Sequence, residues 1–196
     1  MVQQIVLPIK DSNILKMVQD TLLDSFRAGR RNYTIFQVGK ATLLRVSDVM
    51  KLKKSDVFNP DGTVKQTAFI HDQKTGKANT LYLKPVQQDL LIYHNWLVQQ
   101  NLNSEWLFPS TSRPDRHITE KHFYKVMARV GDLLSINYLG THTMRKTGAY
   151  RVYTQSNYNI GLVMNLLNHS SEAMTLTYLG LDQASRETIL DQIDFG

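Results

Sequence analysis

The spacing of apolar residues in this chain of 196 residues follows a helical period and changes once, between residues 57 and 83. Before and after that stretch, apolar side chains recur every three or four positions, as Ile14, Val18 and Leu22 do, which is typical of helices with one buried face. Within the stretch, short apolar segments alternate with turn sequences, which is typical of hairpins. The pattern therefore predicts an α+β fold that is mainly α-helical, with one small antiparallel sheet of three strands.

The same pattern predicts where the elements lie. The first helix is expected after Asp11-Ser12, with Gly29 just past its end, and the second over 33–44. A short third helix is expected from near Ser47. Further helices are expected to begin near Pro85, Thr119, Thr143, Ile160 and Ser171, and the last to cover 182–193. Strands are expected at 57–58, 67–71 and 80–83, and a buried extended segment at 106–109. Because strands and helices do not alternate along the chain, a doubly wound nucleotide-binding fold is excluded.

Length and composition indicate one globular domain over residues 1–196. The chain is long enough to bury a hydrophobic core, and no repeat or Pro/Gly-rich linker divides it. No apolar run approaches the ~18 residues of a membrane span and no signal peptide opens the chain, so we expect no membrane partner. The absence of cysteine excludes disulfides and thiolate metal sites. We expect the protein to be cytoplasmic.

The positive charge of the chain, formally +6, is concentrated in two segments. In residues 40–54 the only acidic side chain among several basic ones is Asp48. Residues 113–151 contain eight basic and three acidic residues. After Arg151 the balance is acidic, which disfavours contact between the tail and a polyanion. Two basic segments are expected of a surface that neutralises phosphates, although charge alone fits a solvated basic face equally well.

Three polar motifs follow one another at fixed spacings. They are Thr42-Leu43-Leu44-Arg45-Val46-Ser47-Asp48, His142-Thr143-Met144-Arg145, and Leu166-Leu167-Asn168-His169-Ser170 with Tyr178 nine residues after His169. Together they resemble the tyrosine recombinase, or phage integrase, family, whose pattern is T-G-L-R-x-S-[DE]-L, a hairpin lysine, H-x-x-R, L-G-H-x-S and a tyrosine nine residues after that histidine. The resemblance covers the chain from Arg31 to Tyr178, and its ordered parts make it far more specific than H-x-x-R alone.

This resemblance implies the tyrosine recombinase catalytic-domain fold and a site-specific recombinase acting in integration, excision or inversion. Tyr178 would attack a phosphate of double-stranded DNA, form a 3′-phosphotyrosyl intermediate and release a 5′-hydroxyl. A second 5′-hydroxyl would reverse the step, so neither ATP nor another cofactor is expected. Cleavage without a metal needs a nucleophile, cations for the pentacovalent phosphate and a proton donor for the leaving oxygen.

The resemblance also implies a role for each remaining site residue. Arg45 and Arg145 would clamp the phosphate, because a guanidinium donates two parallel hydrogen bonds and stays charged. A phenol with a pKa near 10 needs a base at neutral pH, and His142 is the candidate. His169 would donate to a phosphate oxygen. For each arginine the alternative is a structural ion pair, and for each histidine a structural hydrogen bond.

Two further assignments leave alternatives open. Lys74, in the turn Lys74-Thr75-Gly76-Lys77, is at the position of the family's general acid for the 5′-oxygen, but Lys77 shares that turn. Asp48 would orient Arg45 or a histidine, or it is an acidic residue favoured by the dipole at a helix start. The expected DNA-binding residues are Lys51, Lys53, Lys77, Arg113, Arg116 and Lys146. His71, His94, His117 and His122 show no metal-ligand spacing, and no metal is expected.

The sequence departs from the family pattern at two glycines and in length. Asn168 replaces a glycine and tolerates the left-handed conformation that such a glycine often adopts. Leu43 replaces the other glycine of the pattern, two residues before Arg45, and a leucine there predicts ordinary helical backbone. Only residues 1–32 precede the second expected helix, too few for the family's N-terminal core-binding domain, so the resemblance implies an excised catalytic domain or a short single-domain member.

Three points of function stay open between alternatives. One alternative is a type IB topoisomerase, which has the same set of catalytic residues. The other is a non-cleaving DNA-binding accessory protein, which would share the fold but lack some of the catalytic residues, whereas this sequence has a residue of the expected type at each catalytic position. The resemblance implies a monomer in solution and a homo-tetramer on paired DNA sites. In such assemblies an amphipathic tail like 182–196, with Ile189, Ile193 and Phe195 apolar, would dock on a neighbouring subunit; its alternative is packing on its own core.

Overall fold

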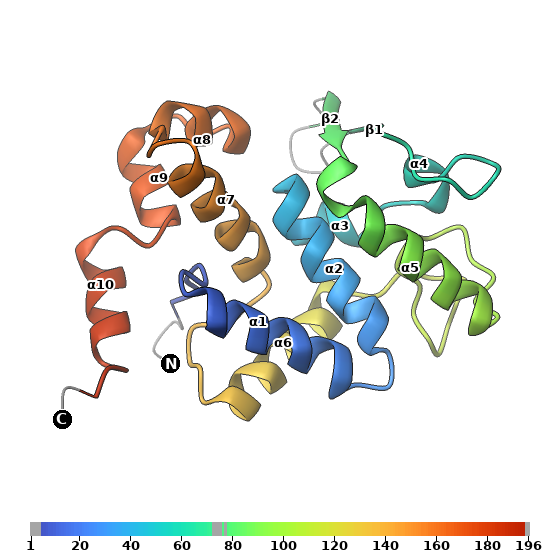
Figure 1. Cartoon of the computed structure of the whole chain (residues 1–196), viewed down its shortest axis with the longest axis horizontal. Helices are drawn as coiled ribbons and strands as arrows, with labels where there is room; N and C mark the ends of the chain where they lie inside the picture. The colour runs from blue at the N-terminus through green and yellow to red at the C-terminus, as the bar shows by residue number, and fades with distance from the viewer. Residues whose placement is uncertain (1–4, 72–75, 77, 195–196) are drawn as a thin grey trace.

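The computed structural model describes residues 5–71, 76 and 78–194, and it is mainly helical (Figure 1). Its elements are α1 (Ser12–Asp24), α2 (Gly29–Thr42), α3 (Val46–Met50), α4 (Lys54–Val57), β1 (Thr67–His71), β2 (Ala78–Tyr82), the 3-10 turn η1 (Lys84–Val86), α5 (Gln87–Gln99), α6 (Glu120–Leu134), α7 (Thr143–Gln155), α8 (Ile160–Leu167), α9 (Glu172–Tyr178) and α10 (Gln183–Leu190). None of these helices is long and apolar enough to cross a membrane. The predicted α+β class with a helical majority is therefore confirmed.

The sheet has two strands in the described part of the chain, so the third predicted strand is wrong. β1 and β2 pair antiparallel with Thr67 opposite Tyr82 and His71 opposite Ala78. Val57 instead ends α4, and the N–H of Phe58 donates to the Lys54 carbonyl at 2.8 Å. Because this helical hydrogen bond uses the backbone that a strand would need, Phe58 makes only an isolated bridge to Val64.

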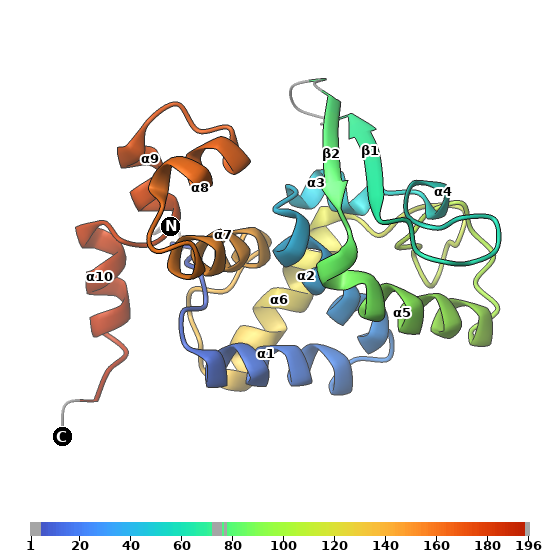
Figure 2. The same cartoon turned by 45° about the horizontal axis from the view of Figure 1, so that its top comes forward.

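Two hydrophobic clusters hold the helices together. The main cluster packs α2 between α1 and α5, with Phe36, Tyr93 and Phe123 fully buried at its centre. The burial predicted for 106–109 is confirmed at Leu107 and Phe108, which are fully buried, but the segment bends at these two residues and pairs only through isolated bridges at Trp106 and Pro109. A smaller cluster joins the end of α2 to α7, α8 and α9. In both views α8 and α9 lie together over α7 (Figures 1 and 2).

Several predicted helix ends shift in the structure. α1 ends at Asp24 and Gly29 begins α2, because a Cβ on Gly29 would stand 1.8 Å from the Leu23 carbonyl oxygen. Only a glycine permits that close return of the chain after α1. α2 accordingly runs over Gly29–Thr42 instead of 33–44, and α10 ends at Leu190, before the predicted end at Ile193.

The turn after α2 corrects the expectation for Leu43. Leu43 has φ 55° and ψ 24°, which is left-handed backbone and not ordinary helix. Its buried side chain packs with Ala149, Val163 and Leu167, and this burial offsets a backbone cost of roughly 1–2 kcal/mol. Asn168 is also left-handed, with φ 55°, so the expectation that asparagine tolerates this conformation is confirmed.

We predict that replacing Leu43 with glycine is less harmful than replacing it with alanine. Leu43→Ala loses the buried side chain and keeps the strained backbone, so the free energy of unfolding should fall by about 2–4 kcal/mol. Leu43→Gly loses the same contacts but relieves the strain, which should return about 1 kcal/mol. Urea denaturation of both variants measures the difference. An alanine variant as stable as the glycine variant would contradict a strained Leu43.

Candidate active site

The residues predicted to form the site come from four separate parts of the chain. Arg45 precedes the first turn of α3, Arg145 lies in the first turn of α7, His169 lies between α8 and α9, and Tyr178 is the last residue of α9. α7 packs against α2 and α8, and α8 packs against α9, so the fold brings these segments together. Lys74 and Lys77 lie outside the described residues.

Arg145 is buried at the centre of this arrangement. Its guanidinium Nη2 donates to the Leu167 carbonyl at 3.3 Å, and its Cζ lies 5.9 Å from the centroid of the Tyr178 ring. Burial lowers the pKa of Arg145; the Tyr178 phenol and the Asp48 carboxylate oppose that shift, and the charge of Arg45 adds to it. These couplings show that Arg45, Asp48 and Tyr178 all lie within electrostatic reach of the Arg145 guanidinium.

Tyr178 packs edge-to-face against His169. The two ring centroids are 5.1 Å apart with an interplanar angle of 78°. The Tyr178 hydroxyl is buried and forms no hydrogen bond with any described residue. Burial raises the pKa of Tyr178, while the positive charges of Arg145 and Arg45 lower it. The Arg145 guanidinium also lies close enough to the phenol oxygen for a hydrogen bond between them to lower the pKa of Tyr178. The phenol is therefore neutral at neutral pH, and its oxygen faces the Arg145 guanidinium without a hydrogen bond of ordinary geometry.

Thr175, which the sequence motifs did not indicate, orients His169. The Thr175 hydroxyl donates to the Ser171 carbonyl at 3.1 Å and lies 3.1 Å from His169 Nδ1. Because a hydroxyl has one proton, Nδ1 must be the donor to Thr175. Neutral His169 then presents its Nε2 lone pair. Thr175 stands three residues before Tyr178 and so on the same side of α9, which is the one sequence signal that could have identified it.

His142 stands at the start of α7 among positive charges. Its pKa is lowered by loss of solvation and by the charges of Lys146, Arg145 and Arg45, with Glu120 acting in the opposite direction. A histidine whose pKa lies below the usual value is neutral at pH 7 and can accept a proton. Asp48, buried in the first turn of α3, raises the pKa of Arg145 and so lies on the site side of that helix.

The residues predicted to bind DNA differ in the contacts that they make within the chain. Lys53 Nζ lies 2.8 Å from Glu105 and 5.5 Å from the centre of the Trp106 ring, and Lys146 Nζ donates to the Val6 carbonyl at 2.7 Å. Lys51, Arg113 and Arg116 are exposed, Arg116 with its Nε 3.7 Å from Asp115. Lys53 and Lys146 therefore have contacts within the chain that compete with a phosphate.

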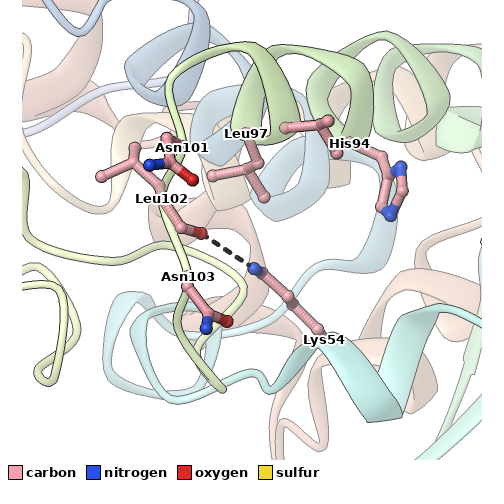
Figure 3. A pocket seen from close by; sticks show the side chains of 7 residues that line it. Lys54, His94, Leu97, Asn101, Leu102 and Asn103 are labelled. Carbon is pink, nitrogen blue, oxygen red and sulfur yellow. Dashed lines mark hydrogen bonds between the residues drawn. The ribbon is translucent and has the colours of Figure 1, made fainter.

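A surface pocket beside the end of α5 contains none of the site residues (Figure 3). Lys54 and His94 line it with the apolar side chain of Leu97, and the Lys54 amine donates to the Leu102 carbonyl at 3.1 Å. The lysine in this pocket thus already hydrogen-bonds to the backbone, and neither Arg45 nor Arg145 lines the pocket. Among the described residues, no group of three or more histidines and carboxylates is placed to hold a metal.

Comparison with known proteins identifies the class. The model of the phage integrase family matches residues 10–185, so the chain belongs to that family. "Probable integrase/recombinase YoeC" of Bacillus subtilis (strain 168) is 30% identical over 180 residues, which are 91% of this chain and 92% of that protein.

Solved recombinases show the same fold. The XerA recombinase superposes with a TM-score of 0.69 at 20% identity, over 98% of this chain and 65% of that one. A lambda integrase dimer bound to a COC' core site gives a TM-score of 0.64 at 18% identity, over all of this chain and 65% of that one. The chain thus spans less than two thirds of these solved chains. The predicted tyrosine recombinase catalytic-domain fold is confirmed.

We predict that Thr175 sets the tautomer of His169. Thr175→Val removes the acceptor of the Nδ1 proton, so the Nδ1–H tautomer should lose population and the free energy of unfolding should fall by about 1 kcal/mol. Thr175→Ser keeps the hydroxyl, so the tautomer population and the free energy of unfolding should stay close to those of the wild type. Nitrogen chemical shifts of the His169 ring, measured by NMR, report the tautomer. A valine variant with the tautomer of the serine variant would show that Thr175 does not orient the ring.

Proposed function

We propose that this chain cleaves and rejoins double-stranded DNA through a 3′-phosphotyrosyl intermediate, as a site-specific recombinase acting in integration, excision or inversion. The observation that carries the proposal is the surroundings of Tyr178. A buried hydroxyl that makes no hydrogen bond of ordinary geometry faces the Arg145 guanidinium and stands beside the His169 ring, and Arg45 acts on all three electrostatically. Membership of the phage integrase family supports the same chemistry.

In the proposed reaction the Tyr178 oxygen attacks the scissile phosphorus and the bond from phosphorus to the 5′-oxygen breaks. The phenol loses its proton as the new bond forms, and the 5′-oxygen gains one as it leaves. Arg45 and Arg145 stabilise the charge that develops on the phosphate oxygens. The reverse step, with a 5′-hydroxyl as the nucleophile, restores the DNA backbone and frees Tyr178.

The proton transfers are assigned by chemistry and position. His142 is the proposed base, because its lowered pKa keeps it neutral and able to take the phenol proton at neutral pH. The acid for the 5′-oxygen is proposed to be Lys74, with Lys77 as the alternative. His169 has a pKa lowered by burial and by Arg145 and Arg45. A bound phosphate would raise that pKa, so that a protonated His169 donates from Nε2.

Double-stranded DNA is the proposed partner. The two basic segments favour a polyanion, and the solved neighbours include a XerH recombinase bound to its difH substrate and the lambda integrase dimer on its core site. Lys51, Arg113 and Arg116 are exposed and are the proposed phosphate contacts outside the site, together with Lys77. We further propose that the protein is monomeric in solution and forms a homo-tetramer on paired sites.

The role of the tail (residues 182–196) is also a proposal. In the described residues, Ser185 is buried, Ile189 packs against the main core and Gln192 hydrogen-bonds to Asn137. Leu190 and Ile193 are about half exposed, at 50% and 47%. Their apolar side chains form the surface that a neighbouring subunit would cover on a tetramer. Phe195 lies outside the described residues.

The nucleophile is tested by replacing Tyr178 with phenylalanine. Wild-type protein incubated with a nicked recognition-site duplex should give a protein–DNA adduct that survives SDS, and Tyr178→Phe should bind the same duplex with the same affinity but give no adduct. The ring and its contact with His169 remain in this variant, so only the oxygen is removed. An adduct from the variant would refute the assignment of Tyr178. DNA binding without any wild-type adduct would instead favour a non-cleaving accessory protein.

The phosphate clamp is tested at both arginines. Arg45→Ala and Arg145→Ala should each lower the rate of adduct formation by about two orders of magnitude or more, because each removes a charged donor from the transition state. Arg45→Lys and Arg145→Lys keep the charge but lose the planar fork, so intermediate rates are expected. Single-turnover assays give the rates, with the exposed Arg27→Ala as control. Lysine variants as slow as the alanine variants would mean that geometry alone, and not charge, sets the rate.

A further inference from the structure

The N-terminal strap, defined as residues 5–10, runs across α7 and is part of the folded core (Figures 1 and 2). Leu7 and Ile9 are fully buried. The Ile9 N–H donates to the Thr147 hydroxyl at 2.9 Å, and the Leu7 N–H donates to the Tyr138 carbonyl at 3.2 Å. Because its apolar side chains and its backbone are both engaged, the strap is a fixed surface against which neighbouring groups can be held.

One lysine ties the strap to the chain directly after Tyr178. Lys10 Nζ donates to the Gly180 carbonyl at 2.5 Å. Gly180 has φ +63°, and a Cβ there would stand 3.1 Å from Pro8 Cδ, so a glycine is needed for the strap to approach the turn. Burial lowers the pKa of Lys10, which shows that its amine is withdrawn from water. The C-terminal end of α9 is therefore fixed by the strap.

A second lysine links the strap to the ring of the nucleophile. Lys146 Nζ donates to the Val6 carbonyl at 2.7 Å, and the same nitrogen lies 5.1 Å from the centroid of the Tyr178 ring. A cation at this distance is attracted by the ring face. Lys146 directly follows Arg145, whose guanidinium lies 5.9 Å from the same ring. Adjacent residues of α7 thus hold the phenol, one of them anchored by the strap.

From this geometry we infer that Lys146 is a positioning residue for the Tyr178 phenol, with Lys10 as a second tie, and that the N-terminal strap is part of the machinery that aims the nucleophile. The inference rests on the proposed function and replaces the expectation from the sequence that Lys146 binds DNA, because Lys146 then acts on the ring. The ammonium has three N–H donors, but the bond to the Val6 carbonyl fixes its position beside the ring, so any phosphate would have to come to that position.

The test compares Lys146→Met with Lys146→Arg in the full chain. Methionine keeps most of the length of the side chain but removes the donor and the charge, and a small displacement of the phenol should slow single-turnover adduct formation by about tenfold to a hundredfold. Arginine can still donate to the Val6 carbonyl and should restore most of the rate. The control is Lys16→Met, which removes an exposed lysine paired with Asp20 on α1 and should leave the rate unchanged.

Two measurements on DNA separate positioning from the alternatives. A positioning residue leaves the Kd of DNA binding and its salt dependence unchanged, whereas a phosphate contact would lower the slope of log K against log salt by about one. A duplex with sulfur in place of the bridging 5′-oxygen has a thiolate leaving group that needs no proton. If Lys146 were the general acid, that duplex would rescue Lys146→Met; a positioning role predicts that the defect persists. A reduced salt slope or a rescue would overturn the inference.

A measurement without cleavage keeps the inference separate from the proposed function. Amide hydrogen exchange over residues 172–180 should be faster in Lys146→Met and in Lys10→Met than in wild type, and unchanged in Lys16→Met. If wild type forms no adduct while exchange responds in this way, the recombinase proposal fails and the strap inference stands as a structural restraint. If wild type cleaves but both variants match it in rate and exchange, the strap inference alone is wrong. Lys10→Met carries the test if Lys146→Met does not fold.

Discussion

The close crossing of α2 and α7 determines where Arg45 and Arg145, the proposed phosphate clamp, stand. A Cβ on Gly39 would lie 2.3 Å from Met144 Sδ, and a Cβ on Gly148 would lie 2.0 Å from the Lys40 carbonyl oxygen. At Gly148 the close atom belongs to the backbone of α2, so the two helices meet there at a distance that only glycine allows, and Gly39 makes room for the Met144 side chain. Since Arg45 follows the end of α2 and Arg145 lies in the first turn of α7, any wider crossing would separate the two guanidiniums. The geometry of the clamp depends on these glycines as much as on the arginines.

This geometry gathers positive charge around a neutral phenol. Arg45 lowers the pKa values of Arg145, His142 and His169, which means that the positive form of each is held near a like charge at a cost in stability. Arg45 also lowers the pKa of Tyr178, but there the positive charge favours the phenolate. Asp48 offsets part of that cost at Arg145. A phosphate diester would relieve the rest, so the same repulsion that opposes folding favours binding of the proposed substrate.

The sequence predicted the features that depend on local patterns and missed those that depend on distant contacts. Helical periods, the Asp11 cap of α1 and the order of the motifs are local, and the structure confirms the helices and the fold. The conformation of Leu43 is decided by a cluster formed with α7 and α8, which no local rule contains. Thr175 was missed because it acts through His169. Lys146 was assigned to DNA because nothing in the sequence shows that a partner 140 residues away lies beside it.

The acidic tail acquires a role from the same distant contacts. Its charge disfavours a phosphate, but Asp182 raises the pKa values of both Lys10 and Lys146, the two lysines that join the strap to α9. The carboxylate thus helps both amines to stay charged where burial opposes charge. If the tail docks on a neighbouring subunit, as the family resemblance implies, Asp182 moves away from these lysines and their hold on Tyr178 weakens. Such docking would couple the placement of the tail to that of Tyr178, the proposed nucleophile, through charge as well as through the chain.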